Sequence, residues 1–239
     1  MKKLFVLVGV VILASSTTKA QELNLEQVLD KYYKATGIDK LQNVNSIIMS
    51  GTLVTHVVMP YKVYRLRPNK YRMERDVNDI TGATVYDGQK GWFTAPWSRN
   101  PNPQEASGLM LTDLLIQSDF DGLLYNWSLK DEKAELVGKE TVNNSDAYKI
   151  KLIRKDGGVE FYLIDCNSFL LVKKTGTRTL RDKELQTYSE FNDYRDVDGI
   201  KFAYRVYNFL ESQQPSEIEY ESIELNKPID PNLFIIPIK

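Results

Sequence analysis

Few side chains in this 239-residue sequence could perform acid–base, nucleophilic or metal chemistry. His56 is the only histidine, and it lies within the apolar run TLVTHVVM, so a Ser-His-Asp or Cys-His device would depend on that one side chain. Cys166 is the only cysteine and lies in a turn-forming sequence, DCNS. The sequence has no HExxH, paired CxxC, GxGxxG or P-loop pattern. We therefore predict a protein that is not an enzyme and that needs no cofactor.

An acidic run, DYRDVDG, offers Asp193, Asp196 and Asp198 as oxygen ligands for a calcium ion. The Asp198-Gly199 pair is also a strong hairpin-turn signature, and the twelve-residue calcium loop ending in a bidentate glutamate is missing. We therefore predict a hairpin here and no metal site.

The first twenty residues combine two lysines, an apolar run from Leu4 to Ala14 and a small-residue end at Ala20. This pattern is typical of a secretory signal peptide, with cleavage expected after Ala20. An apolar run of this length falls short of the roughly 20 residues that span a bilayer. The remaining chain is slightly acidic, which gives no support for a nucleic-acid partner. We expect a periplasmic protein with one domain over 21–239.

The chain beyond the signal peptide predicts a helix, then strands, then an apolar helical stretch, then strands again. Apolar residues from Leu23 to Gly37 follow helical spacing. The predicted strands cover 46–57, 60–67, 70–77, 80–86 and 89–95, then, after a helical 103–127, a strand near 134 and strands at 146–155, 158–165, 169–178, 184–194, 200–211 and 215–225. Turn sequences between them indicate hairpins, so we predict a mainly β (α+β) fold. Its strongly curved antiparallel sheet of about eleven strands would wrap over the helices.

Two neighbouring segments are unusually apolar: the strand end GWFTAPW and the helix GLMLTDLLI. The helix is apolar over much of its circumference, which is typical of burial on both sides. Either these segments form ordinary core, or the helix returns as a lid over the concave face of the sheet.

The segments VYRLRPNKYRMER and TVYDGQKGWFTAPWSRNP resemble the periplasmic lipoprotein-carrier superfamily of the LolA/LolB type. The similar positions are Arg67-Pro68-Asn69, Tyr71-Arg72, Asp87-Gly88, Trp92 and Pro96, and the likeness extends in outline over residues 22–237. The loop APWSRNPNPQ departs from the pattern of the family.

This resemblance implies an incomplete β-barrel with helices as a lid over an apolar cavity for the acyl chains of lipoproteins or lipids. It implies a carrier, expected to be a monomer, that meets transport components of the inner and outer membranes. The alternative is a sensor on the same fold that binds mislocalised lipoprotein and a membrane partner. Arg67 would latch the lid by bonding lid-helix carbonyls, although a strand-end arginine could equally pair with a nearby acid. The implied cavity and lid residues are Trp92, Phe93, Trp97, Leu109, Met110, Leu111, Leu114 and Leu115.

Overall fold

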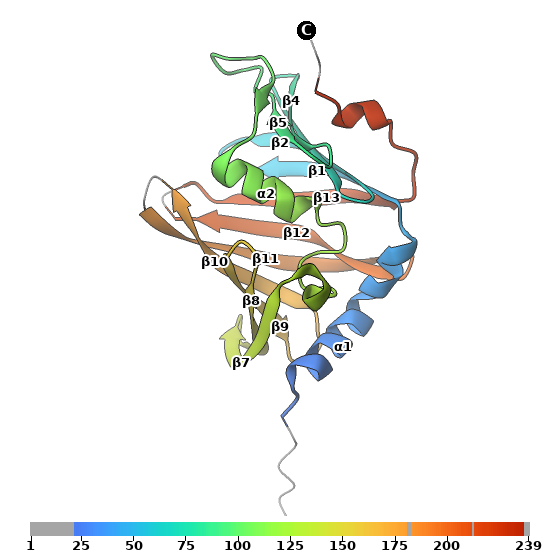
Figure 1. Ribbon diagram of the computed structural model, residues 1–239, viewed down its shortest axis with the longest axis vertical. Coiled ribbons are helices and arrows are strands. Elements are labelled where there is room, and N and C mark those ends of the chain that lie inside the picture. Colours follow the sequence, from blue (N-terminus) through green and yellow to red (C-terminus); the bar gives the residue numbers. More distant parts are fainter. Residues whose placement is uncertain (1–21, 181–182, 212, 237–239) are drawn as a thin grey trace, which may run out of the picture.

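The computed structural model describes residues 22–180, 183–211 and 213–236, and the signal peptide expected at 1–20 lies outside them. The described strands form one antiparallel sheet of thirteen strands (Figure 1). They are β1 Ser46–Val54, β2 Val58–Leu66, β3 Lys70–Val77, β4 Ile80–Tyr86, β5 Gly91–Phe93, β6 Gln104–Glu105, β7 Lys133–Val142, β8 Ser145–Ile153, β9 Val159–Asp165, β10 Leu171–Leu180, β11 Lys183–Val197, β12 Ile200–Leu210 and β13 Ser216–Leu225. The helical segments are α1 Leu25–Thr36, η1 Ile38–Asn43, α2 Gly108–Ser118, η2 Trp127–Lys130 and η3 Pro231–Phe234.

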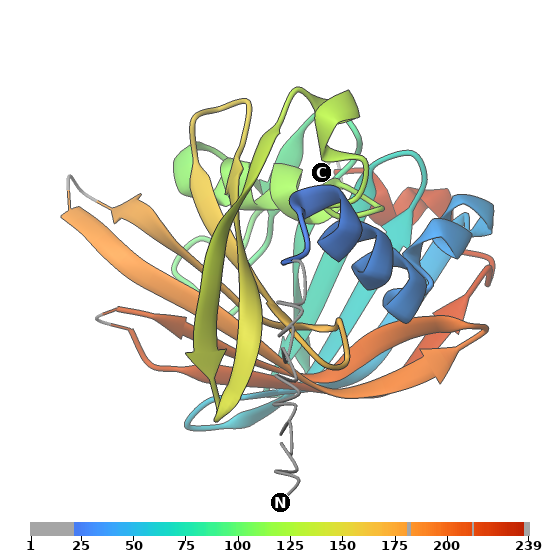
Figure 2. The same ribbon diagram turned by 90° about the horizontal axis from the view of Figure 1, so that it is seen from below.

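Two meanders make up the sheet, and they join where the first strand pairs with the last. The strand order is β6-β5-β4-β3-β2-β1-β13-β12-β11-β10-β9-β8-β7, so β6 and β7 are the two edges. Figure 2 shows that the sheet curls into a cup and that α1 and α2 lie inside it. The mainly β, strongly curved and unclosed sheet predicted from the sequence is confirmed. The two-residue β6, which lies in the stretch predicted as helical, accounts for part of the difference from about eleven strands.

Irregular pairing accompanies the curvature of the sheet. The register shifts between Ser50 and Gly51 in β1, between Leu136 and Gly138 in β7, and between Leu171 and Lys173 in β10. An extra residue on one strand of a pair increases local bending and twist, so these shifts help the sheet to curl. The predicted turn at Asp198-Gly199 joins β11 to β12, with positive φ angles of 53° and 79° that suit a tight hairpin.

The first helix begins and ends where its sequence indicates. The Asn24 side chain accepts a hydrogen bond from the Gln27 amide, and the Gln27 side chain accepts one from the Asn24 amide. Gly37 ends α1 in the left-handed conformation, and a short 3-10 segment, η1, follows it. Val28, Leu29 and Tyr32 are the buried apolar residues of α1, which places them against the sheet.

The second helix is shorter than the helical stretch predicted over 103–127. It ends at Ser118, and a loop then carries Phe120, Leu124 and Tyr125 into the interior before η2. Asp119 has extended backbone angles, and Gly122 and Asn126 have positive φ angles, so the backbone cannot continue as an α-helix. The apolar residues that suggested a longer helix are buried by a loop instead.

The C-terminal segment covers part of the outer, convex face. Phe234 in η3 is fully buried against Ala83, Val85 and Trp92. The indole Nε1 of Trp92 donates a 3.3 Å hydrogen bond to the Phe234 carbonyl. Trp92 therefore fixes the end of the chain to the back of the sheet.

No helix among the described residues is long and apolar enough to cross a membrane.

Candidate functional site

The concave face of the sheet holds a cavity of about 530 Å³, here called the inner cavity. Residues from β1, β2, β3, β10, β11, β12 and β13 line it from the sheet, and α1, η1, the end of α2 and the loop after it border it on the other side. Its volume falls within the range of small-molecule sites. Apolar or aromatic lining residues include Ile38, Leu41, Met49, Val63, Phe120, Leu171, Phe191, Ile200, Phe202, Val206 and Ile218.

Helix α1 closes one flank of the inner cavity. Its buried residues pack on strands β8 to β10 in a cluster that includes Ile150, Leu152 and Ile164, all fully buried. The hydroxyl of Tyr33 donates a 2.7 Å hydrogen bond to the Leu124 carbonyl in the loop after α2. The loop after α2 is therefore hydrogen-bonded to α1, a helix of the core.

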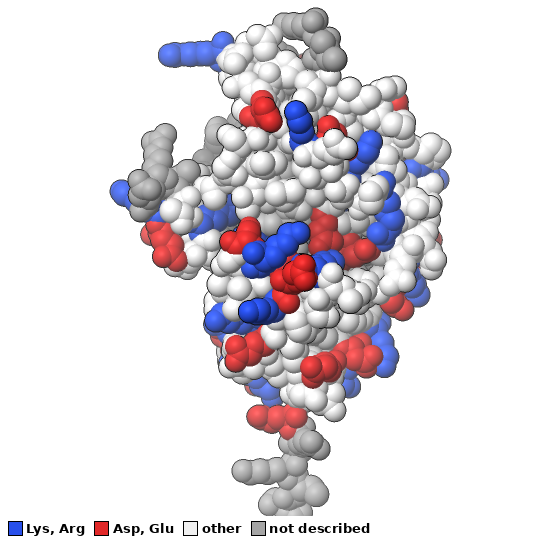
Figure 3. All heavy atoms as spheres, viewed as in Figure 1, with Lys and Arg blue, Asp and Glu red and all other residues white. Residues whose placement is uncertain are grey.

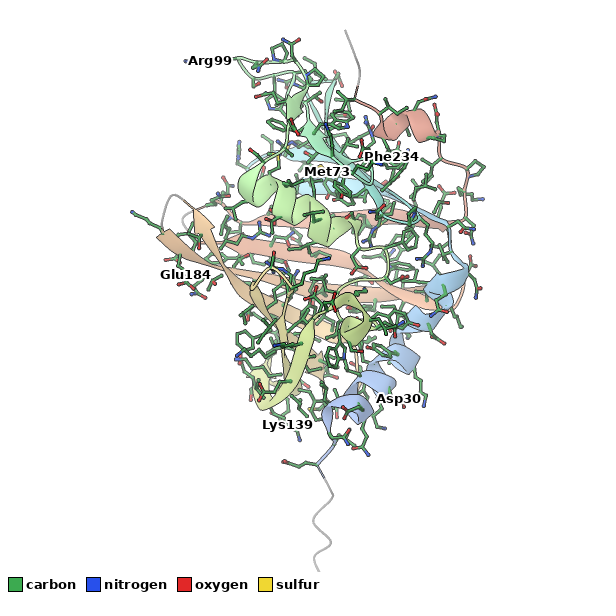
Figure 4. The ribbon with its side chains drawn as sticks, viewed as in Figure 1. Asp30, Met73, Arg99, Lys139, Glu184 and Phe234 are labelled. Carbon is green, nitrogen blue, oxygen red and sulfur yellow. The ribbon has the colours of Figure 1, made fainter. Side chains whose placement is uncertain are left out.

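Helix α2 closes the other flank. Leu114 is only 2 % exposed and packs with Val63, Tyr71 and Tyr86. A Cβ atom on Gly91 would lie 2.8 Å from a Leu114 methyl group, so any other residue there would displace the Leu114 side chain. Met73 of β3 packs against the same cluster and is labelled beside α2 in Figure 4. Phe234, labelled in the same figure, lies in η3 and belongs to a different cluster.

A second hollow of about 670 Å³, here called the outer groove, runs between α2 and strand β10. Gln117, Lys174, Ser189 and Asn208 line both the outer groove and the inner cavity, so the groove leads into the cavity. An ion pair between Asp113 of α2 and Arg178 of β10 bridges the groove. On the face shown in Figure 3, an uncharged stretch over α2 is bordered by charges of both signs.

Arg67, the predicted latch, connects the η1 segment to the loop after α2. Its guanidinium donates to the Leu41 and Val44 carbonyls of the η1 segment, each at 2.7 Å, and makes a bidentate pair with Asp121 at 2.5 and 3.0 Å. It also lies 4.2 Å from the centre of the Phe120 ring. The contact with an acid, left open from the sequence, is thus present, but the carbonyls that Arg67 bonds belong to η1 and not to the lid helix.

The carbonyls at the end of α2 are bonded by Arg65, which the sequence did not single out. Its Nη2 atom donates to the Gln117 carbonyl at 2.6 Å and to the Asp119 carbonyl at 2.7 Å. These oxygens lie at the C-terminus of the helix, where the helix dipole favours a cation. Arg65 lies on β2, and Arg67 directly follows the last residue of that strand. The two arginines are two positions apart, which places their side chains on the same face of an extended chain, and this spacing was the available sequence signal.

Three tyrosine side chains surround Arg65 in the inner cavity: Tyr61, Tyr71 and Tyr220. Tyr71 lies opposite Arg65 in the pairing of β2 with β3, and the Tyr61 and Tyr220 rings have centres 6.3 Å apart. Burial raises the pKa of all three hydroxyls and lowers the pKa of Arg65. The hydroxyls therefore keep their protons at neutral pH and remain hydrogen-bond donors.

The remaining predicted lid residues divide between several surfaces. Leu111 packs inward beside Leu114, and Leu109 lines the outer groove. Met110 and Leu115 are exposed by 39 % and 48 %. Leu115 also lines a third hollow of about 530 Å³, on the side of α2 where Tyr86 and Leu123 lie.

The three aromatic residues of GWFTAPW do not line the inner cavity. Trp92 faces the convex side, because alternation along β5 points it away from Gly91 and towards η3. Phe93 has the orientation of Gly91 but lies beyond the cavity lining. The Trp97 ring covers Gly82 of β4 and lies 5.2 Å from the Arg75 guanidinium.

The residues considered for catalysis or metal binding lie apart from each other. His56 is exposed between β1 and β2, and Cys166 lies in the turn after β9. Asp193 pairs with Arg195, and the Asp196 side chain accepts a hydrogen bond from the Gly199 amide in the hairpin. No group of three His, Cys, Asp or Glu side chains suited to a metal ion occurs among residues 22–180, 183–211 and 213–236.

Comparison with solved structures shows a LolA-like fold. The chain is similar to a LolA superfamily protein from Nitrosomonas europaea, with a TM-score of 0.58 and 14% identity over 90% of this chain and 98% of the other. It is also similar to a domain named as an outer membrane lipoprotein-sorting protein from Vibrio parahaemolyticus, with a TM-score of 0.60 and 11% identity over 88% and 95% of the two chains. A DUF1329 family protein from Desulfovibrio piger matches with a TM-score of 0.54 and 13% identity over 87% and 97%. No protein-family model and no curated protein matches the sequence.

Proposed function

We propose that this protein is a non-catalytic carrier that holds the acyl chains of lipids or lipoproteins in the inner cavity and moves them through the periplasm towards the outer membrane. The observation that carries the proposal is the cavity on the concave face, which is lined largely by apolar and aromatic side chains and bordered by α1, η1, the end of α2 and the loop after it. The names of two proteins with this fold, which refer to LolA and to lipoprotein sorting, support the same function.

The hydrophobic effect explains why such a ligand needs a covered cavity. Keeping an acyl chain of roughly 16 carbons out of water is worth on the order of 12 kcal/mol, at about 0.8 kcal/mol for each methylene. An open groove would leave much of that chain hydrated. A covered cavity retains the chain during transit, and motion of the cover then controls release.

The contacts of α2 suit a cover that opens. At its N-terminal end, Ser107 makes no side-chain capping bond, and a Cβ atom on Gly108 would contact nothing within 4 Å. At its C-terminal end, Arg65 bonds the helix, and Tyr33 binds the loop that follows. Before α2, strand β6 and a 2.8 Å hydrogen bond from the Ala106 amide to the Gly91 carbonyl hold the chain to β5. We therefore expect α2 to move between these two attached ends, widening the outer groove as the Asp113–Arg178 pair separates.

The direct test is to purify the exported protein from a bacterial host, extract it for lipid mass spectrometry, and titrate it with a fluorescent acyl probe. We expect co-purified lipid and saturable probe uptake. Absence of both would overturn the proposal.

A variant that fills the cavity locates the site. Val206 is a partly buried residue of the cavity lining, and Val206→Trp adds bulk there, which we expect to weaken probe binding about tenfold or more. Val137→Trp on β7 is the matched control, because Val137 is 42 % exposed and lies outside the cavity lining. Equal binding by both folded variants would place the probe elsewhere.

A further inference from the structure

Arg65 is a partly buried cation with an enclosed Nε atom, and it has no carboxylate partner among the described residues. The two nearest acids already have other partners: Asp119 pairs with Lys130 at 2.7 Å, and Asp121 pairs with Arg67 at 2.5 Å. Buried charges in proteins are almost always paired, so a positive charge left over inside an apolar cavity needs an explanation.

The hydrogen-bonding capacity of Arg65 is also unfilled. Both of its bonds to the end of α2 come from Nη2, and its Nε atom is buried without a hydrogen-bond partner among the described residues. An unmade hydrogen bond of a buried charged group costs more than that of a neutral one. Nη1 also makes no hydrogen bond to the described residues and, unlike Nε, is not enclosed, so the guanidinium has donors available while Nη2 still bonds the end of α2.

Further donors converge on the same part of the inner cavity. The hydroxyls of Tyr61, Tyr71 and Tyr220 lie around Arg65, and Lys174, Ser189 and Asn208 lie where the cavity meets the outer groove. The apolar lining continues from this cluster to η1, β11 and β12. The cavity thus combines a cationic, donor-rich end with an apolar remainder.

We propose that the cargo is an amphiphile with a compact anionic headgroup, a carboxylate or a phosphate monoester, which enters the inner cavity and binds Arg65 among the three tyrosines while its acyl chain lies along the apolar lining. This inference rests on the proposed function and specifies its cargo. A planar guanidinium suits both headgroups, since its N–H donors match two oxygens of either anion. The same arginine would then hold the headgroup and the end of the lid.

The test compares a fluorescent fatty acid with its methyl ester, which has the same chain and fluorophore but no charge. At pH 7.5 we expect the wild-type protein to bind the acid about tenfold more tightly than the ester, or better. We expect Arg65→Met to abolish this preference by weakening binding of the acid alone. Arg205→Met is the matched control, because Arg205 is a half-exposed arginine outside the cavity lining, and it should keep the wild-type ratio.

Each outcome separates the headgroup inference from the carrier function. Equal binding of acid and ester by the wild-type protein would overturn the inference and leave the carrier function standing, whereas binding of neither would remove both. If Arg65→Met weakens the acid and the ester alike, Arg65 acts only on the lid and the inference fails.

Two further arms complete the experiment. If Arg65→Met does not fold, Tyr61→Phe combined with Tyr220→Phe removes two donors and keeps both rings, and the acid-to-ester preference should fall by about threefold or more. No change of that ratio would contradict the inference. Competition by hexadecyl phosphate and by palmitate distinguishes the two headgroups, and a failure of both to displace the probe would overturn the proposal.

Discussion

The two long helices lie on the same concave face, but they are built differently. Helix α1 has a reciprocal capping box at its start, a left-handed glycine at its end and one buried apolar stripe. Helix α2 has neither cap and no acidic residue in its first turn. It buries Leu114 but leaves Met110 and Leu115 exposed by 39 % and 48 %.

We infer from this difference that α1 belongs to the permanent core and that α2 is the part that moves in the proposed carrier. A capped, amphipathic helix is stabilised by its own ends and by one packed face, so α1 can form with the sheet and stay there. An uncapped helix that is apolar on several sides depends on its contacts with neighbours. For α2 these contacts are the packing of Leu114 on the sheet, the hydrogen bonds from Arg65 and the Asp113–Arg178 ion pair.

The largest expected effect on stability comes from a substitution in the core helix α1. Leu29→Ala in α1 should lower the free energy of unfolding by about 2 to 5 kcal/mol, because Leu29 is 4 % exposed and its loss leaves a cavity. Leu115→Ala in α2 is the matched control and should change stability by less than about 0.5 kcal/mol. Urea unfolding followed by tryptophan fluorescence measures both. Equal losses would show that the two helices are equivalent parts of the core.

Next in size is removal of the guanidinium that ties η1 to the loop after α2. Arg67→Met loses two carbonyl bonds and leaves Asp121 without its partner, so we expect a loss of about 2 kcal/mol, reduced by partial solvent exposure of the pair. Amide hydrogen exchange should rise in residues 119–126 and stay unchanged in α1. Exchange that rises throughout the sheet would instead assign Arg67 to global stability.

Substitutions at the N-caps of the two helices should have smaller effects on stability, and these effects should differ between α1 and α2. Asn24→Ala removes the capping box of α1 and should cost about 1 kcal/mol. Ser107→Ala at the same position of α2 should change stability by less than about 0.3 kcal/mol, because Ser107 makes no side-chain cap bond. Thermal or urea unfolding of the two variants side by side provides the measurement. A large loss in Ser107→Ala would contradict the description of α2 as uncapped.

The smallest effect on stability concerns the pair across the outer groove. Asp113→Asn should cost less than about 1 kcal/mol, because both side chains are 37 % exposed and solvent screens the pair. Release of an acyl probe should nevertheless become about twofold to fivefold faster, since the pair joins α2 to β10. Stopped-flow release at low salt and at about 0.5 M salt tests this, and the difference from wild type should shrink at high salt. An unchanged release rate at both salt concentrations would exclude the pair as a restraint on the lid.

Local patterns predicted the first helix and the meander well. Asn24 and Gly37 are capping residues whose effect depends only on nearby backbone, and Asp198-Gly199 specifies a turn by its own conformational preference. The break after Ser118 was missed, because Phe120, Leu124 and Tyr125 continue an apolar pattern that a buried loop also satisfies.

The candidate site was harder to predict, because its residues meet through distant parts of the chain. Trp92 is apolar and ends a strand, but the face on which it lies follows from Phe234, 142 positions further along the sequence. Arg65 near the end of β2 and Arg67 just after it share one face of the chain, and the sequence alone does not say which of them reaches the end of α2.

The pairing of β1 with β13 has a consequence for how the chain acquires its structure. At this seam the Asn45 amide bonds the Asn226 side chain, 181 positions away, and β1 itself pairs with β13 from Ile47 to Val54. Contacts between such distant residues form slowly, because a long loop must close before they contribute any stability. The first meander therefore cannot complete its central pairing until β13 has been synthesised. We expect folding to be slow and to finish only after β13 is available. An export step that the expected signal peptide would direct could then act on the chain while it is still unfolded.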